Sequence, residues 1–84
     1  MELSLIIPAK DEEKRILKTL KIITNYLKDN YDYEILVVND GSTDQTQEIV
    51  NNFIKTNSRC KLLNHQTNYG KGKAVKTGIQ ASTK

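Results

Sequence analysis

Short apolar runs alternate along this chain with longer segments in which apolar residues recur at helical spacing. The runs at residues 3–7, 33–38 and 60–63 have the length and the side chains of strands. Segments of helical spacing separate these runs, and another such segment follows the last run. Strands that are joined by crossover helices pair in parallel, with right-handed crossovers. The sequence therefore predicts a three-layer α/β fold with a parallel sheet and the element order β-α-β-α-β-α.

The strand order of this sheet follows from the crossover rule. The three strands are expected in the order 3-2-1, with residues 3–7 at an exposed edge. The first two strands are apolar nearly throughout, which predicts burial on both faces. An apolar strand at an edge is open to pairing with other chains. Residues 1–84, enough for one small domain, are therefore interpreted as the truncated N-terminal part of a larger domain.

Each predicted helix has an apolar face and signals at its start. Pro8 is expected to end the first strand, because proline has no backbone N–H. Acidic residues 11–13 are expected at the positively polarised start of the first helix. The second helix has two candidate caps, which are Asp44 and a capping box of Ser42 with Gln45. The apolar faces comprise Ile16, Leu20, Ile23 and Leu27, then Ile49, Val50, Phe53 and Ile54, then Ala74, Val75, Gly78 and Ile79.

Composition narrows the class of protein. With 37% apolar and 27% charged residues, the chain is typical of a soluble globular domain rather than a disordered or fibrous one. The net charge of +3 is mild, so the lysines are interpreted as a solvated surface and no nucleic-acid partner is expected. Cys60 has no second cysteine to pair with, which favours a reducing, cytoplasmic setting. No signal peptide and no membrane span are expected, because the apolar runs fall far short of the ~20 residues that a span needs.

Polar loops leave the carboxyl ends of all three predicted strands, at residues 8–12, 39–43 and 64–73. In open parallel sheets, ligands bind beyond these ends, so the loops are expected to share one site. In the first loop, Pro8 either rigidifies the strand exit for a ligand or merely ends the strand, while Glu12 favours the helix start.

The second loop begins with Asp40, directly after a buried strand. An ionised carboxylate only accepts hydrogen bonds, which suits the ring N–H of a uracil or guanine base. Gly41 permits the sharp turn that follows. The structural alternative is an Asx-type turn that leads into a helix cap.

The third loop carries Gly70, Lys71, Gly72 and Lys73 just before a helix. Backbone N–H groups and the helix dipole favour a phosphate there, and lysine adds charge. A flexible basic loop is the alternative interpretation. The spacing excludes a Walker A loop, because alanine follows Lys73, and it excludes a dinucleotide fingerprint, because the glycines follow the third strand.

Two ring side chains in the same stretch have less specific interpretations. His65 has no cysteine at metal-ligand spacing and is interpreted as a surface loop residue. Tyr69 is expected either to stack on a base or to pack in the loop.

Three segments together resemble the family 2 glycosyltransferases: residues 6–12 (IIPAKDE), 37–44 (VVNDGSTD) and 68–74 (NYGKGKA). The likeness is closest to the dolichyl-phosphate and polyprenyl-phosphate sugar synthases and spans essentially the whole chain. It implies a partial GT-A fold, which is a Rossmann-like nucleotide-binding half, and a UDP- or GDP-sugar as donor. For full-length relatives it implies a lipid-phosphate or glycan acceptor and a setting at the cytoplasmic face of a membrane.

The resemblance also assigns roles to residues and leaves alternatives for the chain. The nucleotide-sugar-binding residues are Pro8, Ala9, Lys10, Glu12, Val38, Asp40, Lys71 and Lys73. Lys10 stands where an aromatic residue is often found, and Asp11 stands where asparagine is usual. Full-length relatives hold Mg²⁺ or Mn²⁺ with an Asp-x-Asp motif beyond Lys84, so no catalytic or metal-binding residue is assigned within the chain. The chain is therefore expected to bind a donor for hexose transfer but to be inactive alone; a nucleotide-binding or regulatory module and an inactive gene fragment are the alternatives.

Overall fold

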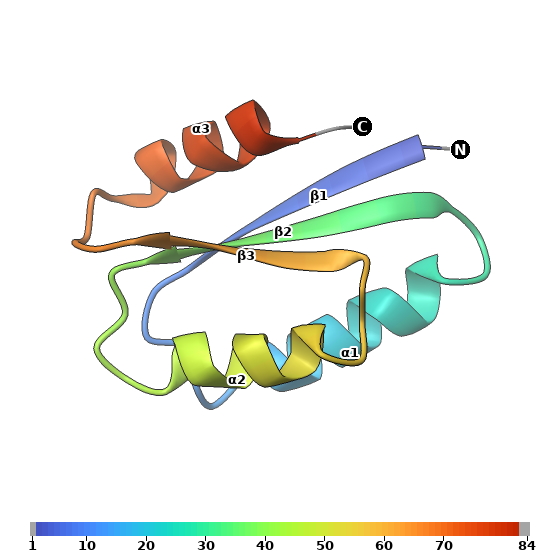
Figure 1. Ribbon diagram of the computed structural model, residues 1–84, viewed down its shortest axis with the longest axis horizontal. Helices are drawn as coiled ribbons and strands as arrows, with labels where there is room; N and C mark the ends of the chain where they lie inside the picture. The colour runs from blue at the N-terminus through green and yellow to red at the C-terminus, as the bar shows by residue number, and fades with distance from the viewer. Residues whose placement is uncertain (1, 83–84) are drawn as a thin grey trace.

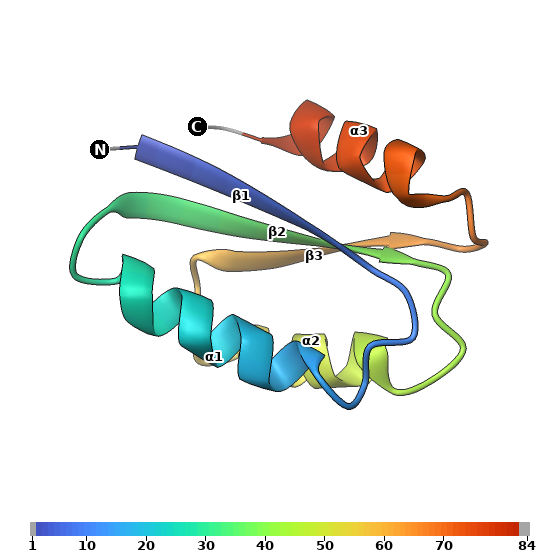
Figure 2. The ribbon, with the colours of Figure 1, turned by 180° about the vertical axis from the view of Figure 1, so that it is seen from behind.

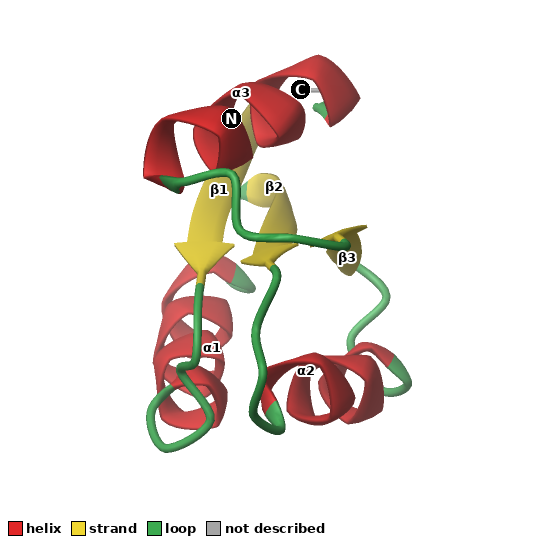
Figure 3. Ribbon diagram, turned by 90° about the vertical axis from the view of Figure 1, so that its left-hand side faces the viewer, coloured by secondary structure: helices red, strands yellow, loops and turns green. Residues whose placement is uncertain are grey.

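The computed structural model describes residues 2–82 and consists of a three-stranded sheet between two helical layers (Figure 1). The elements are β1 (Glu2–Ala9), α1 (Ile16–Leu27), β2 (Asp32–Asp40), α2 (Thr46–Ile54), β3 (Cys60–His65) and α3 (Lys71–Ala81). Viewed along the sheet, α1 and α2 lie together on one face and α3 lies alone on the other (Figure 3). The predicted element order and the three-layer α/β class are confirmed.

All strands of the sheet run parallel, in the order β1-β2-β3, as the crossover rule predicted. β2 is the central strand, and its residues 33–40 are all buried. β1 lies at an edge, and residues 3–8 are only half-buried. The prediction of burial on both faces is therefore correct for β2 and wrong for β1, because an edge strand has a neighbour on one side only.

The strands extend further than the sequence predicted. Pro8 does not end β1, since Pro8 pairs in register with Val38 and the strand continues to Ala9. An edge strand tolerates proline because only one of its sides must form sheet hydrogen bonds. β2 and β3 likewise continue through polar residues, which places Asp40 directly beside His65 in the register.

The face of the sheet under α1 and α2 holds the apolar core. Leu20 and Val50 are fully buried there, and they pack with Ile35, Val37 and Phe53. The helical stripes predicted for α1 and α2 are thus confirmed, with Ile23, Ile49 and Ile54 half-buried at the margin. Burial also raises the pKa of the Cys60 thiol to about 11.

The opposite face is covered by α3, which packs against β1 and β2 (Figure 2). The buried residues of α3 are small, namely Ala74 and Gly78. A Cβ atom on Gly78 would lie 2.4 Å from Ile6 Cγ2, so this contact between helix and sheet requires glycine. Ile79 is 61% exposed, so the prediction that it belongs to the apolar face of the helix is wrong.

The start of α1 also differs from the prediction. The helix begins at Ile16, and no acidic residue lies in its first turn. Residues 11–13 precede the helix because Asp11 has a φ of +52° and a turn follows it before the helical backbone begins. Their backbone N–H groups donate instead to side chains of the β2–α2 connection and of the first residue of α2.

None of the helices within residues 2–82 has both the length and the apolar character that crossing a membrane requires.

Candidate functional site

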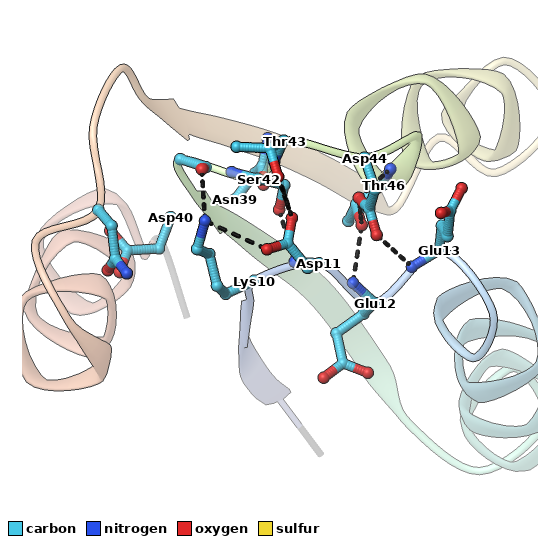
Figure 4. A network of polar contacts seen from close by, with 12 residues as sticks. Lys10, Asp11, Glu12, Glu13, Asn39, Asp40, Ser42, Thr43, Asp44 and Thr46 are labelled. Carbon is cyan, nitrogen blue, oxygen red and sulfur yellow. Dashed lines mark hydrogen bonds and ion pairs between the residues drawn. The ribbon is translucent and has the colours of Figure 1, made fainter.

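The carboxyl ends of the three strands lie at one edge of the sheet, where the β1–α1 loop (residues 10–15) meets the β2–α2 loop (residues 41–45) (Figure 4). Lys10 Nζ donates a hydrogen bond to the Gly41 carbonyl oxygen at 2.9 Å and lies 3.3 Å from the Asp11 carboxylate. The backbone N–H of Asp11 donates to Ser42 Oγ at 3.0 Å. Asp11 Oδ1 in turn accepts the Thr43 N–H at 2.7 Å, and this hydrogen bond holds the pKa of Asp11 below its usual value. Side chains of each loop therefore fix the backbone of the other.

The same pattern continues to the start of α2. The Glu12 N–H donates to Thr46 Oγ1 at 2.8 Å, and the Glu13 N–H donates to Asp44 Oδ2 at 3.2 Å. Asp44 Oδ1 accepts the Thr46 N–H at 2.9 Å, so Asp44 supplies the cap-like contact of α2. Burial alone would raise the pKa of Asp44, but the hydrogen bonds from Thr46 and Glu13 lower it overall. The capping box predicted for Ser42 is wrong, because its hydroxyl bonds to the neighbouring loop.

Asp40 ends β2 and holds the third loop of the site, the β3–α3 loop (residues 66–70). Its side chain is buried, and its Oδ1 atom accepts the Tyr69 N–H at 2.9 Å and a hydrogen bond from His65 Nδ1 at 2.8 Å. Its Oδ2 atom accepts the Gly70 N–H at 2.8 Å. These contacts, the one with His65 first, lower the pKa of Asp40 despite its burial. The carboxylate is therefore ionised at neutral pH.

His65 is not a surface loop residue, and the sequence interpretation of it is wrong. It is the last residue of β3, and its side chain is 10% exposed. Nε2 lies 2.9 Å from Thr77 Oγ1 of α3, and the imidazole meets the Tyr69 ring edge-on at 5.2 Å between centroids. Tyr69 itself is 60% exposed. No spacing rule along the chain connects His65 with Asp40 or Thr77, so this cluster could not be found from the sequence.

A cleft of about 340 Å³ opens between the carboxyl ends of β1 and β2, the β1–α1 loop and the β3–α3 loop with the start of α3. Its lining residues are Pro8, Ala9, Lys10, Glu12, Asp40, Asn68, Gly70 and Lys71. The structure therefore brings most of the sequence-predicted binding residues together. Val38 and Lys73 are the two that do not line the cleft, because Val38 is fully buried within β2 and Lys73 is exposed on α3. Asn68 and Gly70 line it as well, although the sequence-based set of binding residues omits them.

The charges around the cleft are mixed. Two cations, Lys10 and Lys71, and two carboxylates, those of Glu12 and Asp40, line it. The Glu12 carboxylate is directed away from the loop network (Figure 4) and lies 3.0 Å from the guanidinium of Arg15. The cleft thus offers a carboxylate acceptor at Asp40 and a cation at Lys71, next to the N-terminus of α3.

The described residues do not fit a bound metal ion. Within residues 2–82, no group of three or more His, Cys, Asp or Glu side chains is arranged to hold one. The aspartates of the loops instead accept hydrogen bonds from backbone N–H groups.

A parallel sheet with a polar cleft beyond the carboxyl ends of its strands defines the class of open α/β domains that bind ligands at this edge. The comparison with known families is more specific. The family model described as "Glycosyl transferase family 2" matches residues 4–84. The chain therefore belongs to glycosyltransferase family 2, as its loop motifs indicated.

Relatives agree with this assignment. The chain is 45% identical over 82 residues to the dolichyl-phosphate beta-glucosyltransferase ALG5A of Trichomonas vaginalis. The aligned region covers 90% of this chain and 25% of that protein. It is 42% identical over 86 residues to the probable glycosyltransferase YdaM of Bacillus subtilis, covering 96% of this chain and 20% of YdaM. The chain thus spans about a quarter of the length of the curated relatives that it matches first.

Solved structures extend the likeness to the fold. A mannosyltransferase from Pyrobaculum calidifontis, in complex with GDP-Man and Mn²⁺, superposes with a TM-score of 0.83 at 27% identity, covering 96% of this chain and 24% of that one. TarS of S. aureus, in complex with UDP-GlcNAc, gives a TM-score of 0.82 at 30% identity, and the match covers 98% of this chain and 24% of the TarS chain. The predicted GT-A fold is confirmed by these matches.

Proposed function

We propose that residues 1–84 form the nucleotide-sugar-binding part of a family 2 glycosyltransferase domain, which uses a UDP- or GDP-sugar as donor. The observation that carries this proposal is the cleft at the strand ends, which gathers Asp40, Lys71 and most of the other predicted binding residues. Two structurally similar proteins are bound to nucleotide sugars, one to GDP-Man and one to UDP-GlcNAc. The family membership and the location of the cleft thus point to the same ligand.

The chemistry of the cleft suggests how the ligand lies. Asp40 is an acceptor-only carboxylate, so it suits a base with a ring N–H donor, as uracil and guanine have. Lys71 begins α3, where the backbone N–H groups and the helix dipole favour an anion. The proposed pose places the base at Asp40 and the diphosphate at Lys71. Lys73 lies outside the cleft, so Lys71 is the favoured phosphate contact.

In the whole protein, the proposed reaction is transfer of a hexose from the nucleotide sugar to an acceptor. The name of the Trichomonas relative supports a dolichyl phosphate as the proposed acceptor. The proposed setting of the reaction is the cytoplasmic face of a membrane. A divalent cation offsets charge on the leaving diphosphate in such transfers. The described residues provide no site for it, so the proposed role of this chain is to bind and orient the donor.

A nucleotide-binding module without transfer activity is the second candidate function. Its ligand would occupy the same cleft, because Asp40 and Lys71 suit a nucleotide whether or not a sugar is transferred. Residues 1–84 alone are expected to bind the donor without transferring the sugar under both candidates, so the two are separated by an assay of the whole protein with radiolabelled UDP- and GDP-sugars, Mg²⁺ or Mn²⁺ and a polyprenyl phosphate. Metal-dependent turnover supports the enzyme, whereas donor binding without turnover supports the module.

The binding pose is tested by calorimetric titration of the chain with UDP, GDP, uridine and guanosine. Asp40→Asn is expected to weaken binding of the preferred nucleoside roughly tenfold or more, because hydrogen bonds to charged groups are the strong ones. Lys71→Ala is expected to weaken diphosphate binding while sparing the nucleoside, and its effect should shrink as salt rises. Lys76→Ala, an exposed lysine of α3 outside the cleft, is the matched control. The proposal is wrong if the folded wild-type chain binds neither UDP nor GDP.

A further inference from the structure

A polar chain of contacts crosses from β2 through β3 to α3. The Asp40 carboxylate lies 2.8 Å from His65 Nδ1, and His65 Nε2 lies 2.9 Å from Thr77 Oγ1. An ionised carboxylate cannot donate, so Nδ1 carries the proton that bonds to Asp40. In the neutral ring Nε2 is then the acceptor, and the Thr77 hydroxyl donates to it. The network therefore assigns one tautomer to His65.

The arrangement of carboxylate, imidazole and hydroxyl has the same order as a hydrolytic triad, but its location excludes that role. A nucleophile must face a substrate cleft. Asp40 lines the cleft, whereas His65 and Thr77 do not. The chain of contacts thus points away from the ligand space and into the packing between β3 and α3.

The hydrogen bonds on Asp40 show what His65 does for the cleft. Oδ1 accepts both His65 Nδ1–H and the Tyr69 N–H, which occupies its two acceptor positions. Among the described residues, Oδ2 accepts only the Gly70 N–H, so one acceptor position on Oδ2 remains for a ligand. Without the donor at Nδ1, only the Tyr69 and Gly70 N–H groups hold the carboxylate, so one of the three restraints on its orientation is lost.

We propose that His65 is a positioning residue for nucleotide binding, which orients the Asp40 carboxylate toward the base and, through Thr77, holds the β3–α3 loop against α3. This inference rests on the proposed function. His65 contacts Asp40, Tyr69 and Thr77, which belong to β2, the loop and α3 respectively. One ring thus connects the base acceptor with the helix that carries Lys71.

Three variants separate the two hydrogen bonds of the ring. His65→Asn retains an amide donor near the position of Nδ1, His65→Phe keeps a ring without any hydrogen bond, and Thr77→Val removes only the hydroxyl at nearly constant shape. Affinity for UDP and GDP, measured by calorimetry, is expected to fall about tenfold in His65→Phe and about threefold in Thr77→Val. His65→Asn is expected to stay within about threefold of the wild type.

The ¹⁵N shifts of the imidazole report directly on the hydrogen bonds of His65, and they should move when UDP or GDP binds at Asp40, which a purely structural role does not predict. We expect the Nδ1–H tautomer in the wild-type chain and its persistence in Thr77→Val, because Asp40 still accepts from Nδ1. The amide resonances of Tyr69 and Gly70 should shift in His65→Phe and remain close to wild type in His65→Asn. These spectra also report whether each variant is folded.

The outcomes distinguish this inference from the proposed function. If the folded wild-type chain binds no nucleotide, the proposed function fails. If the wild type binds but His65→Phe binds equally well, or if the Nε2–H tautomer predominates in the wild type, the positioning role is overturned and the proposed function stands. Should His65→Phe not fold, the tautomer of His65 in the wild type decides, since a predominant Nε2–H form there would overturn the role without any variant.

Discussion

The two faces of the sheet are packed in different ways. Under α1 and α2, large apolar side chains such as Leu20, Ile35 and Phe53 fill the space between the layers. Under α3, the helix contributes only Ala74 and Gly78 to the buried surface. Polar contacts supplement this thin apolar layer on the α3 side, where Ser4 Oγ donates to the buried Glu34 carboxylate at 2.6 Å. Large apolar side chains thus stabilise one face of the sheet, whereas small residues on the other face let a helix pack close to the sheet.

The difference matters because α3 carries part of the candidate site. Lys71 is the first residue of α3, and Thr77 contacts His65 from its middle. The contact that sets the distance between α3 and β1 is Gly78 against Ile6. The position of the proposed phosphate-binding helix therefore depends on small residues and hydrogen bonds rather than on a large apolar core.

The largest effect is expected from a cavity in the α1–α2 face. Leu20→Ala should lower the free energy of unfolding by about 2–5 kcal/mol, because the side chain is fully buried and its neighbours can only partly refill the space. Ile22→Ala, on the same helix but 59% exposed, is the control and should change it by less than about 0.5 kcal/mol. Urea denaturation measures both. Equal effects would contradict the assignment of the core to this face.

A smaller loss of stability is expected from a methyl group added where α3 approaches β1. Gly78→Ala should destabilise the fold by about 1–3 kcal/mol, because the new methyl group meets Ile6. In the double variant with Ile6→Ala, the two losses should not add, and the coupling is the signature of direct contact. Gly72→Ala is the matched control, since no atom lies within 4 Å of its Cβ position and φ is not positive there. Additive losses in the double variant would show that α3 does not approach β1 so closely.

The smallest loss of stability is expected from a fall in pH, and its distribution over the helices tests the comparison between the two faces of the sheet. The folded-state pKa values of Asp11 and Asp40 are lowered from the ordinary 3.8. Each therefore contributes stability that is fully present above about pH 4 and is lost as pH falls through its lower folded-state value. The Asp11 carboxylate holds the loop that leads to α2, whereas the Asp40 carboxylate holds the loop that leads to α3.

Thermal unfolding between pH 6 and pH 2 measures this loss. Asp11→Asn and Asp40→Asn should each flatten the decline of melting temperature below pH 4, and Asp29→Asn, at an exposed position at the end of α1, should not. In acid, hydrogen exchange should accelerate in α3 before it does in α1 and α2. Simultaneous loss of protection in all three helices would show that the faces are equally robust.

The sequence was sufficient for the architecture because periodicity and the crossover rule act on local patterns. The stripe of α1 and the buried run of residues 33–38 in β2 could be predicted from apolar spacing alone. The predicted strand ends were less accurate. The sequence placed the first strand at an edge, but Pro8 was expected to end it, whereas an edge strand tolerates a residue without a backbone N–H and continues to Ala9. Ile79 was assigned to the core because its spacing is helical, yet the small contact surface of α3 leaves it exposed.

The candidate site was predictable only as a set of loops. Motif resemblance identified Pro8, Asp40 and Lys71, and the structure places these three around one cleft. It could not identify the partner of Asp40, because His65 becomes its neighbour only when β3 extends by two residues beyond its apolar run and pairs in register. Long-range hydrogen bonds between polar residues leave no periodic signal in a sequence.

The parallel register also governs how this chain acquires its structure. Ser4 contacts Glu34, 30 residues later, and Asn39 contacts Asn64, 25 residues later, so the sheet formed by residues 2–82 contains no locally paired hairpin. Each pairing must first close a long loop, which slows folding compared with a chain of the same length that has local strand pairs. Both pairings use β2. During synthesis, β1 therefore remains without a partner until β2 has emerged, and the central strand is the point from which ordering of the sheet can begin.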